Sequence, residues 1–146
     1  MFARLVAVAL LLVAVALAVA GCGTLHQGCT EVGCSSGVNV DVSNLDVQPD
    51  DMVEYRVCVE DVCREGRGQV HTLRQGERWL TVGLNEIPDD ESVAVRVTIT
   101  DTTGRQLADA TGRGEVTVSR PNGNDCPPEC RNVTVVLRGA EVVPVA

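Results

Sequence analysis

The sequence predicts an all-β protein, a single antiparallel β-sandwich of seven or eight short strands. Apolar residues recur with a period of two from Gly37 onward, turn-forming residues interrupt the pattern about every ten residues, and no window after residue 22 has the pattern of an amphipathic helix. Strict alternation buries one face of a strand and leaves the other in water, as in antiparallel sheets.

Each predicted strand is a run in which valine, isoleucine or leucine alternates with polar side chains. The clearest runs cover residues 38–42, 53–59, 93–99, 116–118 and 133–137, and weaker ones cover 69–73 and 78–82. Turn residues lie between them at 49–51, 88–90, 101–104 and 121–124. This spacing in about 100 residues is typical of an immunoglobulin-like sandwich, with a transthyretin-like sandwich as the alternative.

The first 22 residues have the features of a secretory signal. An unbroken apolar run over residues 5–20 follows Arg4 and ends in Val19-Ala20-Gly21-Cys22. Sixteen apolar residues span about 24 Å as a helix, less than the ~30 Å hydrocarbon core that a membrane anchor must cross. Small residues before a cysteine at the end of such a run resemble the signal peptides of bacterial lipoproteins. The resemblance implies cleavage before Cys22 and acylation of Cys22, which then anchors the chain on the extracytoplasmic face of the cell membrane.

We therefore divide the chain into a signal peptide (1–21), an acylated tether with Cys29 and Cys34 (22–36), the sandwich (37–140) and a C-terminal tail (141–146). The net charge is −8, and all twelve basic side chains are arginine. An acidic chain is a poor partner for nucleic acid or anionic lipid headgroups, so membrane attachment would depend on the lipid. The arginine-only, Ala/Val/Gly-rich composition suggests an actinobacterial source.

Seven cysteines leave an even six once Cys22 is acylated, which in an oxidising compartment predicts three disulfides. Cys58 and Cys63 would face each other across a hairpin with Glu60-Asp61 as its turn. The other four lie just before the first and last strands, which run parallel and side by side in such sandwiches. The predicted pairs are therefore Cys34–Cys130 and Cys29–Cys126.

Two alternatives remain for these four cysteines. Local closure would give Cys29–Cys34 and Cys126–Cys130. A zinc site would use the same thiols, but their spacers hold three and four residues where zinc knuckles use two, and extracytoplasmic thiols oxidise. We expect no metal and no cofactor.

Catalytic candidates are few. The two histidines are His26, in the tether, and His71, in a weak strand, and we interpret His71 as a surface residue. Tyr55 and Trp79 are too few aromatic rings for a sugar-binding platform. The sequence favours a non-enzymatic binding or scaffold module of the cell envelope, with an envelope protein or other ligand as partner. The loops at 88–91 and 121–124 are its candidate surfaces. The alternatives are an envelope hydrolase with paired carboxylates and an accessory domain of a membrane complex.

Overall fold

The computed structural model describes residue 29 and residues 31–73 and 76–145. The chain divides into two units, residues 1–30 and residues 31–146, and the second is the folded body. Cys22 and His26 lie outside the described residues. No helix occurs in the described part of the chain, and therefore none there that could cross a bilayer.

The described residues of the body form nine strands, where the sequence predicts seven or eight. They are β1 (Gly37–Asp41), β2 (Met52–Val59), β3 (Val62–Gln69), β4 (His71–Thr72), β5 (Arg78–Gly83), β6 (Ser92–Asp101), β7 (Gln106–Ser119), β8 (Cys130–Arg138) and β9 (Glu141–Pro144). The all-β prediction is confirmed. The sheet runs on past residue 140, because Val142 on β9 is buried and residues 141–144 pair with β8.

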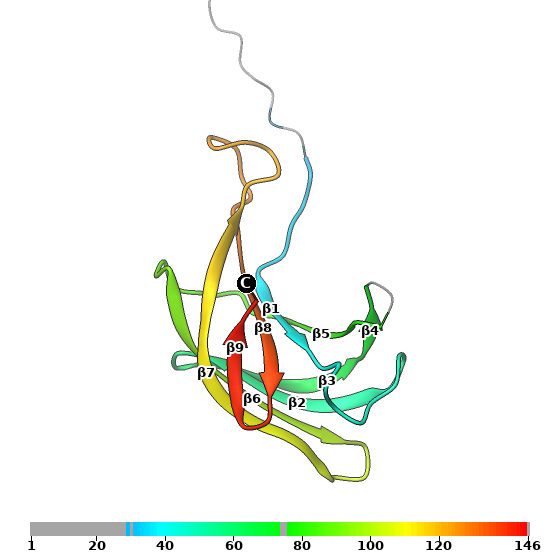
Figure 1. Ribbon diagram of the computed structural model, residues 1–146. Coiled ribbons are helices and arrows are strands. Elements are labelled where there is room, and N and C mark those ends of the chain that lie inside the picture. Colours follow the sequence, from blue (N-terminus) through cyan, green and yellow to red (C-terminus); the bar gives the residue numbers. More distant parts are fainter. Residues whose placement is uncertain (1–28, 30, 74–75, 146) are drawn as a thin grey trace, which may run out of the picture. The chain divides into compact units, whose positions relative to one another are not determined.

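The strands form one strongly curled sheet in the order β3-β2-β6-β7-β9-β8-β1-β5-β4, with a further pairing of β7 and β8 (Figure 1). The sheet is mixed: most pairs are antiparallel, as the sequence predicts, and β1–β8 and β7–β9 are parallel pairs. Strands far apart in the chain can pair in either direction, whereas a tight hairpin enforces the antiparallel one. The predicted Cys34–Cys130 bridge depends on such a parallel pair between the first strand and a strand near the end of the chain.

The second and third strands stay together in the sheet. β2 pairs with β3 over their full lengths, from Met52 opposite Gln69 to Val59 opposite Val62. In immunoglobulin domains the second and third strands lie in different sheets, so this hairpin departs from the immunoglobulin-like order that the sequence predicts. A two-residue connection cannot carry the chain across a sandwich, and Glu60-Asp61 instead forms a tight turn in which Glu60 has a φ of 50°.

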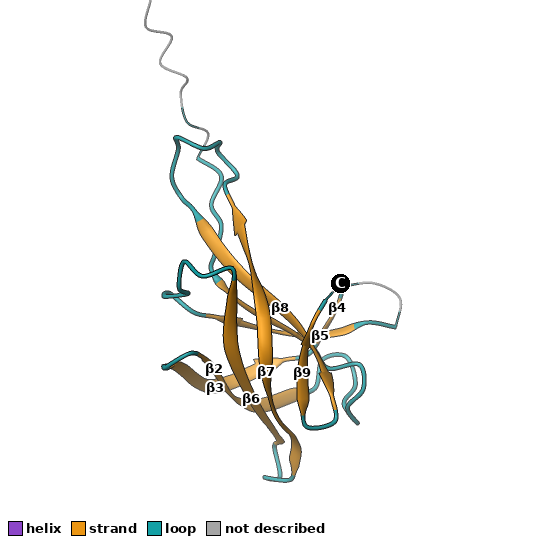
Figure 2. Ribbon diagram, turned by 60° about the vertical axis from the view of Figure 1, so that its left-hand side comes forward, coloured by secondary structure: helices purple, strands orange, loops and turns teal. Residues whose placement is uncertain are grey.

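β7 is far longer than the two-valine run that predicts it. Its first part pairs with β6, and its end, from Val116 to Ser119, pairs with β8 (Figure 2). Two glycines near the end of the part that pairs with β6 allow close contact: a Cβ on Gly112 would lie 2.0 Å from the Val142 carbonyl oxygen, and one on Gly114 would lie 2.4 Å from Val133 Cγ1. The sequence pattern missed the part of β7 before Val116, because Ala108, Ala110, Gly112 and Gly114 occupy the alternate positions where other strands have valines.

The core is built mainly from β-branched side chains that point inward from every second position. Val38, Val40, Val82, Val97 and Val133 are fully buried. Valine loses little rotamer freedom in a strand and packs well on a pleated surface. The curled sheet comes close to closing where Leu80 of β5 covers Gly68 of β3, because a Cβ on Gly68 would lie 2.6 Å from Leu80 Cδ1.

Candidate functional site

Both loops that the sequence singles out lie at one end of the sheet. We call this the clamped end and define it as residues 31–36, 84–91 and 120–130. Figure 1 shows residues 31–36 running beside the loop between β7 and β8. The Leu84 amide donates to the Ser36 carbonyl over 3.1 Å, which ties the second segment to the first.

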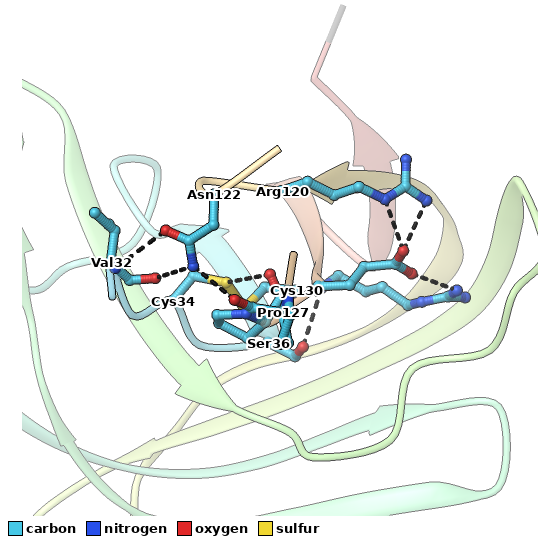
Figure 3. Close-up of a disulfide and its surroundings, with 10 residues drawn as sticks. Val32, Cys34, Ser36, Arg120, Asn122, Pro127 and Cys130 are labelled. Atoms are coloured by element: carbon cyan, nitrogen blue, oxygen red, sulfur yellow. Dashed lines mark hydrogen bonds and ion pairs between the residues drawn. A yellow bond between two sulfur atoms is a disulfide. The ribbon is translucent and has the colours of Figure 1, made fainter. Parts of the chain in front are cut away.

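A disulfide between Cys34 and Cys130 closes this end, with the two Cα atoms 6.0 Å apart (Figure 3). The parallel register of β1 and β8 sets Gly37 beside Asn132, so the chain segments that precede both strands leave the sheet together. Cys130 is 3% exposed, which shields the bond from one side. This is the predicted long-range pair, and it rules out local closure and a zinc site that needs these two thiols.

The second predicted bridge, Cys58–Cys63, is also present in the β2–β3 hairpin, with a Cα–Cα distance of 4.0 Å. Cys29 and Cys126 are both disulfide-bonded. Because Cys29 belongs to the separate N-terminal unit, the Cys29–Cys126 pairing stays a prediction.

The side chain of Asn122 holds the incoming segment by its backbone. The Val32 amide donates to Asn122 Oδ1 over 3.1 Å, and Asn122 Nδ2 donates to the carbonyl oxygens of Val32 (3.0 Å) and Pro127 (2.6 Å). One amide group therefore pairs with Val32 as a neighbouring strand would, and it also braces its own loop (Figure 3). The segment that leads into the body is fixed at two successive points, Val32 and Cys34.

Two arginines flank one carboxylate in the same region. Glu129 accepts hydrogen bonds from Arg131 Nη2 and from Arg120 Nε, each over 2.8 Å. The bond from Arg131, and then that from Arg120, lowers the pKa of Glu129, while Glu129 in turn raises the pKa of Arg131. Arg131 also forms an ion pair with Asp89. The loop at 88–91 is thereby tied to the start of β8 and, through Glu129, to Arg120.

A groove of about 380 Å³ runs along the disulfide, lined by residues 34–36, 83–85 and 128–130. A second groove, of about 440 Å³, lies between residues 84–86 and the part of the β2–β3 hairpin around Cys63 and Arg64. Both grooves share Leu84 and Asn85, so the two disulfides lie on either side of this short segment.

The outer face of β2, β3 and β6 is a second candidate surface, with a groove of about 400 Å³. Its charges come in pairs across neighbouring strands: Arg56 lies 2.8 Å from Glu65, and Arg67 lies 2.7 Å from Glu54. Each carboxylate that a hydrolase would need in this groove already has an arginine beside it. The face is suited to polar contacts with a partner.

Comparison with known protein families, with curated protein sequences and with solved structures found no match. The chemistry of these surfaces must therefore be inferred from their own residues.

The other residues that the sequence singles out, His71, Tyr55 and Asp101, lie on strands or at a turn of the body. His71 is exposed on β4 opposite Trp79, and Tyr55 lies half-buried against Gly66. Asp101 accepts hydrogen bonds from Thr103 and then Arg105, which hold its pKa well below the usual range and organise the turn between β6 and β7. Within residues 31–73 and 76–145, no group of three or more His, Cys, Asp or Glu side chains could hold a metal ion.

Sequence reasoning named Asn122 and Asp89 only as members of exposed loops and missed their partners. It also missed Arg120, Glu129 and Arg131 entirely. The only signal was the presence of arginines on both sides of the Cys126-to-Cys130 segment. A link between residues about ninety positions apart leaves no local pattern, so the structure was needed to find it.

Proposed function

We propose that this chain is a lipid-anchored, non-enzymatic binding or scaffold module on the extracytoplasmic face of a bacterial cell membrane. The observation that carries the proposal is the cysteine pattern. Cys22 follows a signal-like run, and the later cysteines are consumed in disulfides such as Cys34–Cys130. Disulfides of this kind persist outside the reducing cytoplasm, and a signal peptide provides the route there.

The clamped end supports this orientation. Cys34 lies twelve residues after Cys22, and the segment before it is held to the body at Val32 and Cys34. A lipid on Cys22 would therefore keep the body within about 40 Å of the bilayer, given at most ~3.5 Å per extended residue. A rigid attachment to the tether suits a module that presents its surface to envelope partners at a set height.

Binding is favoured over hydrolysis by the state of the carboxylates. Glu54 and Glu65 in the groove on the outer face of β2, β3 and β6 are ion-paired with arginines, and Glu129 at the clamped end lies between two. A general acid needs a raised pKa, whereas the arginines lower that of Glu129. Charged pairs on an exposed strand surface instead suit recognition of a polar partner.

We also propose that the body is a sandwich of the transthyretin-like kind, with layers β3-β2-β6-β7 and β9-β8-β1-β5. The strand order supports this division, since the hairpin β2–β3 stays within one layer and the parallel pair β1–β8 lies at the centre of the other. The end of β7 joins the layers by pairing with β8.

The test of the anchor is the Cys22→Ala variant, expressed in a bacterium with lipoprotein processing. We expect the native chain in the membrane fraction, with an intact mass that lacks residues 1–21 and includes acyl chains, and the variant outside that fraction. A Cys58→Ala/Cys63→Ala variant is the matched control, because it also removes cysteine chemistry but keeps Cys22. Equal membrane retention of Cys22→Ala, or a native mass without acyl chains, would contradict the proposal.

A further inference from the structure

The outer edge of β3 has no paired strand, although Leu80 of β5 packs over Gly68 on the inner face of β3. β3 ends the strand order of the sheet, and in the described part of the chain no strand pairs with it on the side away from β2. Six of its eight residues are exposed. The other end of the sheet is β4, which has only two residues. Strands in sheets usually have about five or six residues, so β3 is the edge long enough to accept another strand.

Hydrogen bonds at both ends of β2 show which backbone groups face this edge. The Glu60 amide donates to the Ala94 carbonyl on the β6 side over 2.9 Å, and the Val70 amide donates to the Asp51 carbonyl over 2.9 Å. Antiparallel pairs alternate between bonding inward and outward. The backbone N–H and C=O groups that point away from β2 are therefore those of Cys63, Glu65, Arg67 and Gln69.

We propose that β3 pairs antiparallel with β3 of a second copy of this chain, with the two Gly66 residues opposite each other. In this register Glu65 lies opposite Arg67 of the second copy, and Arg67 lies opposite its Glu65. These are residues whose backbone groups point outward, so each such pair exchanges two hydrogen bonds. A two-fold axis at Gly66 makes the edge complementary to itself, as symmetric dimers require.

Charge complementarity identifies the occupant of this edge as another copy. Glu65 and Arg67 are 64% and 71% exposed, and both point to the same outer face. Within one chain they pair with Arg56 and Glu54. The second copy would place an opposite charge on their other side, so that a row of alternating charges crosses both sheets. Opposite charges directly across strands stabilise the pairing, and like charges oppose it.

The inner side of the edge carries few side chains of β3 itself. Gly66 and Gly68 carry none, so the exposed Arg64 would lie opposite Gly68 of the second copy and beside the Leu80 side chain that covers this glycine. Tyr55 lies beneath both glycines, within 3.1 Å and 3.2 Å of the positions where Cβ atoms would stand. The Tyr55 side chain, together with Leu80 at Gly68, thus fills the space under the glycines and supports the edge from within the same chain.

The test uses charge reversal on the purified full chain in mild detergent, with two differently tagged copies and sedimentation to measure association. Arg67→Glu would set glutamates opposite each other twice, and Glu65→Arg would do the same with arginines. We expect each variant alone to associate at least tenfold more weakly than the native chain. A mixture of the two variants restores both opposite-charge pairs and should form a mixed dimer.

Arg96→Glu is the matched control, because Arg96 lies on the same face and is ion-paired with Asp109 but belongs to an inner strand. It should associate like the native chain. The mixed dimer separates the proposal from misfolding, since a chain that cannot fold would not be rescued by a partner. A monomeric native chain at 0.1 mM, no association in the mixture, equal loss in Arg96→Glu, or capture of a different protein at β3 in place of a second copy would overturn the proposal.

Discussion

The two disulfides of the body should differ in how much they stabilise it, because they close loops of very different length. Cys34 and Cys130 are 96 positions apart, and Cys58 and Cys63 are five apart. In the chain-entropy model these separations correspond to about 4.7 and about 2.1 kcal/mol at 25 °C. We therefore expect removal of the first bridge to lower the free energy of unfolding by about 2.6 kcal/mol more than removal of the second.

The local surroundings of the bridges are similar enough for a fair comparison. Each joins one buried cysteine, Cys130 at 3% or Cys58 at 8% exposure, to a partner that is more exposed. Replacing both members of a bridge by alanine should thus remove comparable packing in the two cases. Cys29 and Cys126, which are also disulfide-bonded, must be serine in every variant, because another long-range bridge would keep the large loop closed.

The measurement is guanidinium unfolding followed by the fluorescence of Trp79, the only tryptophan in the chain. Cys34→Ala/Cys130→Ala should shift the midpoint to much lower denaturant than Cys58→Ala/Cys63→Ala, and dithiothreitol should lower the stability of the parent. An equal or larger loss from the short-loop variant would refute the loop-length reasoning. A parent whose unfolding is unchanged by reductant would refute a structural role for the bridges.

Two further predictions concern packing and pH. Gly114→Ala should lower the free energy of unfolding by about 1–3 kcal/mol, since its Cβ would lie 2.4 Å from Val133 Cγ1. Val133→Ala in the same chain should recover part of that loss. Additive losses in the double variant would contradict the proposed contact. Asp101 and Glu129 have lowered pKa values in the folded state, so the unfolded state binds protons first as the pH falls. The free energy of unfolding should therefore decrease between about pH 5 and pH 2, and Asp101→Asn should make this decrease smaller; an unchanged acid transition in that variant would count against the Asp101 interactions.

Sequence patterns predicted strands well wherever valines alternate with polar residues. The runs at 38–42, 53–59, 93–99 and 133–137 fall on β1, β2, β6 and β8. Burial of one face gives a period of two that any single strand displays on its own. Most of β7 lacks this alternation of valines and polar residues. Its positions next to Val133 and Val142 are glycines, and a run with glycines looks like a loop in the sequence.

At the clamped end, too, some contacts could be predicted from the sequence and others could not. That Cys34 and Cys130 join could be predicted, because both stand a few residues before strands that were expected to be neighbours. The hydrogen bonds between Asn122 and Val32 and the ion pair between Arg131 and Asp89 could not be predicted. Each joins residues whose distance in space depends on how the loops fold over the end of the sheet.

By itself the sequence determined the strand-forming character of the chain and the signal-like character of residues 1–22. It also predicted a bridge within the hairpin and favoured, over local closure, bridges at the first and last strands of the predicted sandwich. Only the tertiary structure decided the mixed sheet, the place of β3 at its open edge and the partners of the charged side chains. Alternation and spacing are local properties, which each segment carries alone. Strand order and cross-strand contacts arise only when the whole chain buries its valines together, so they are set by the packing of distant segments.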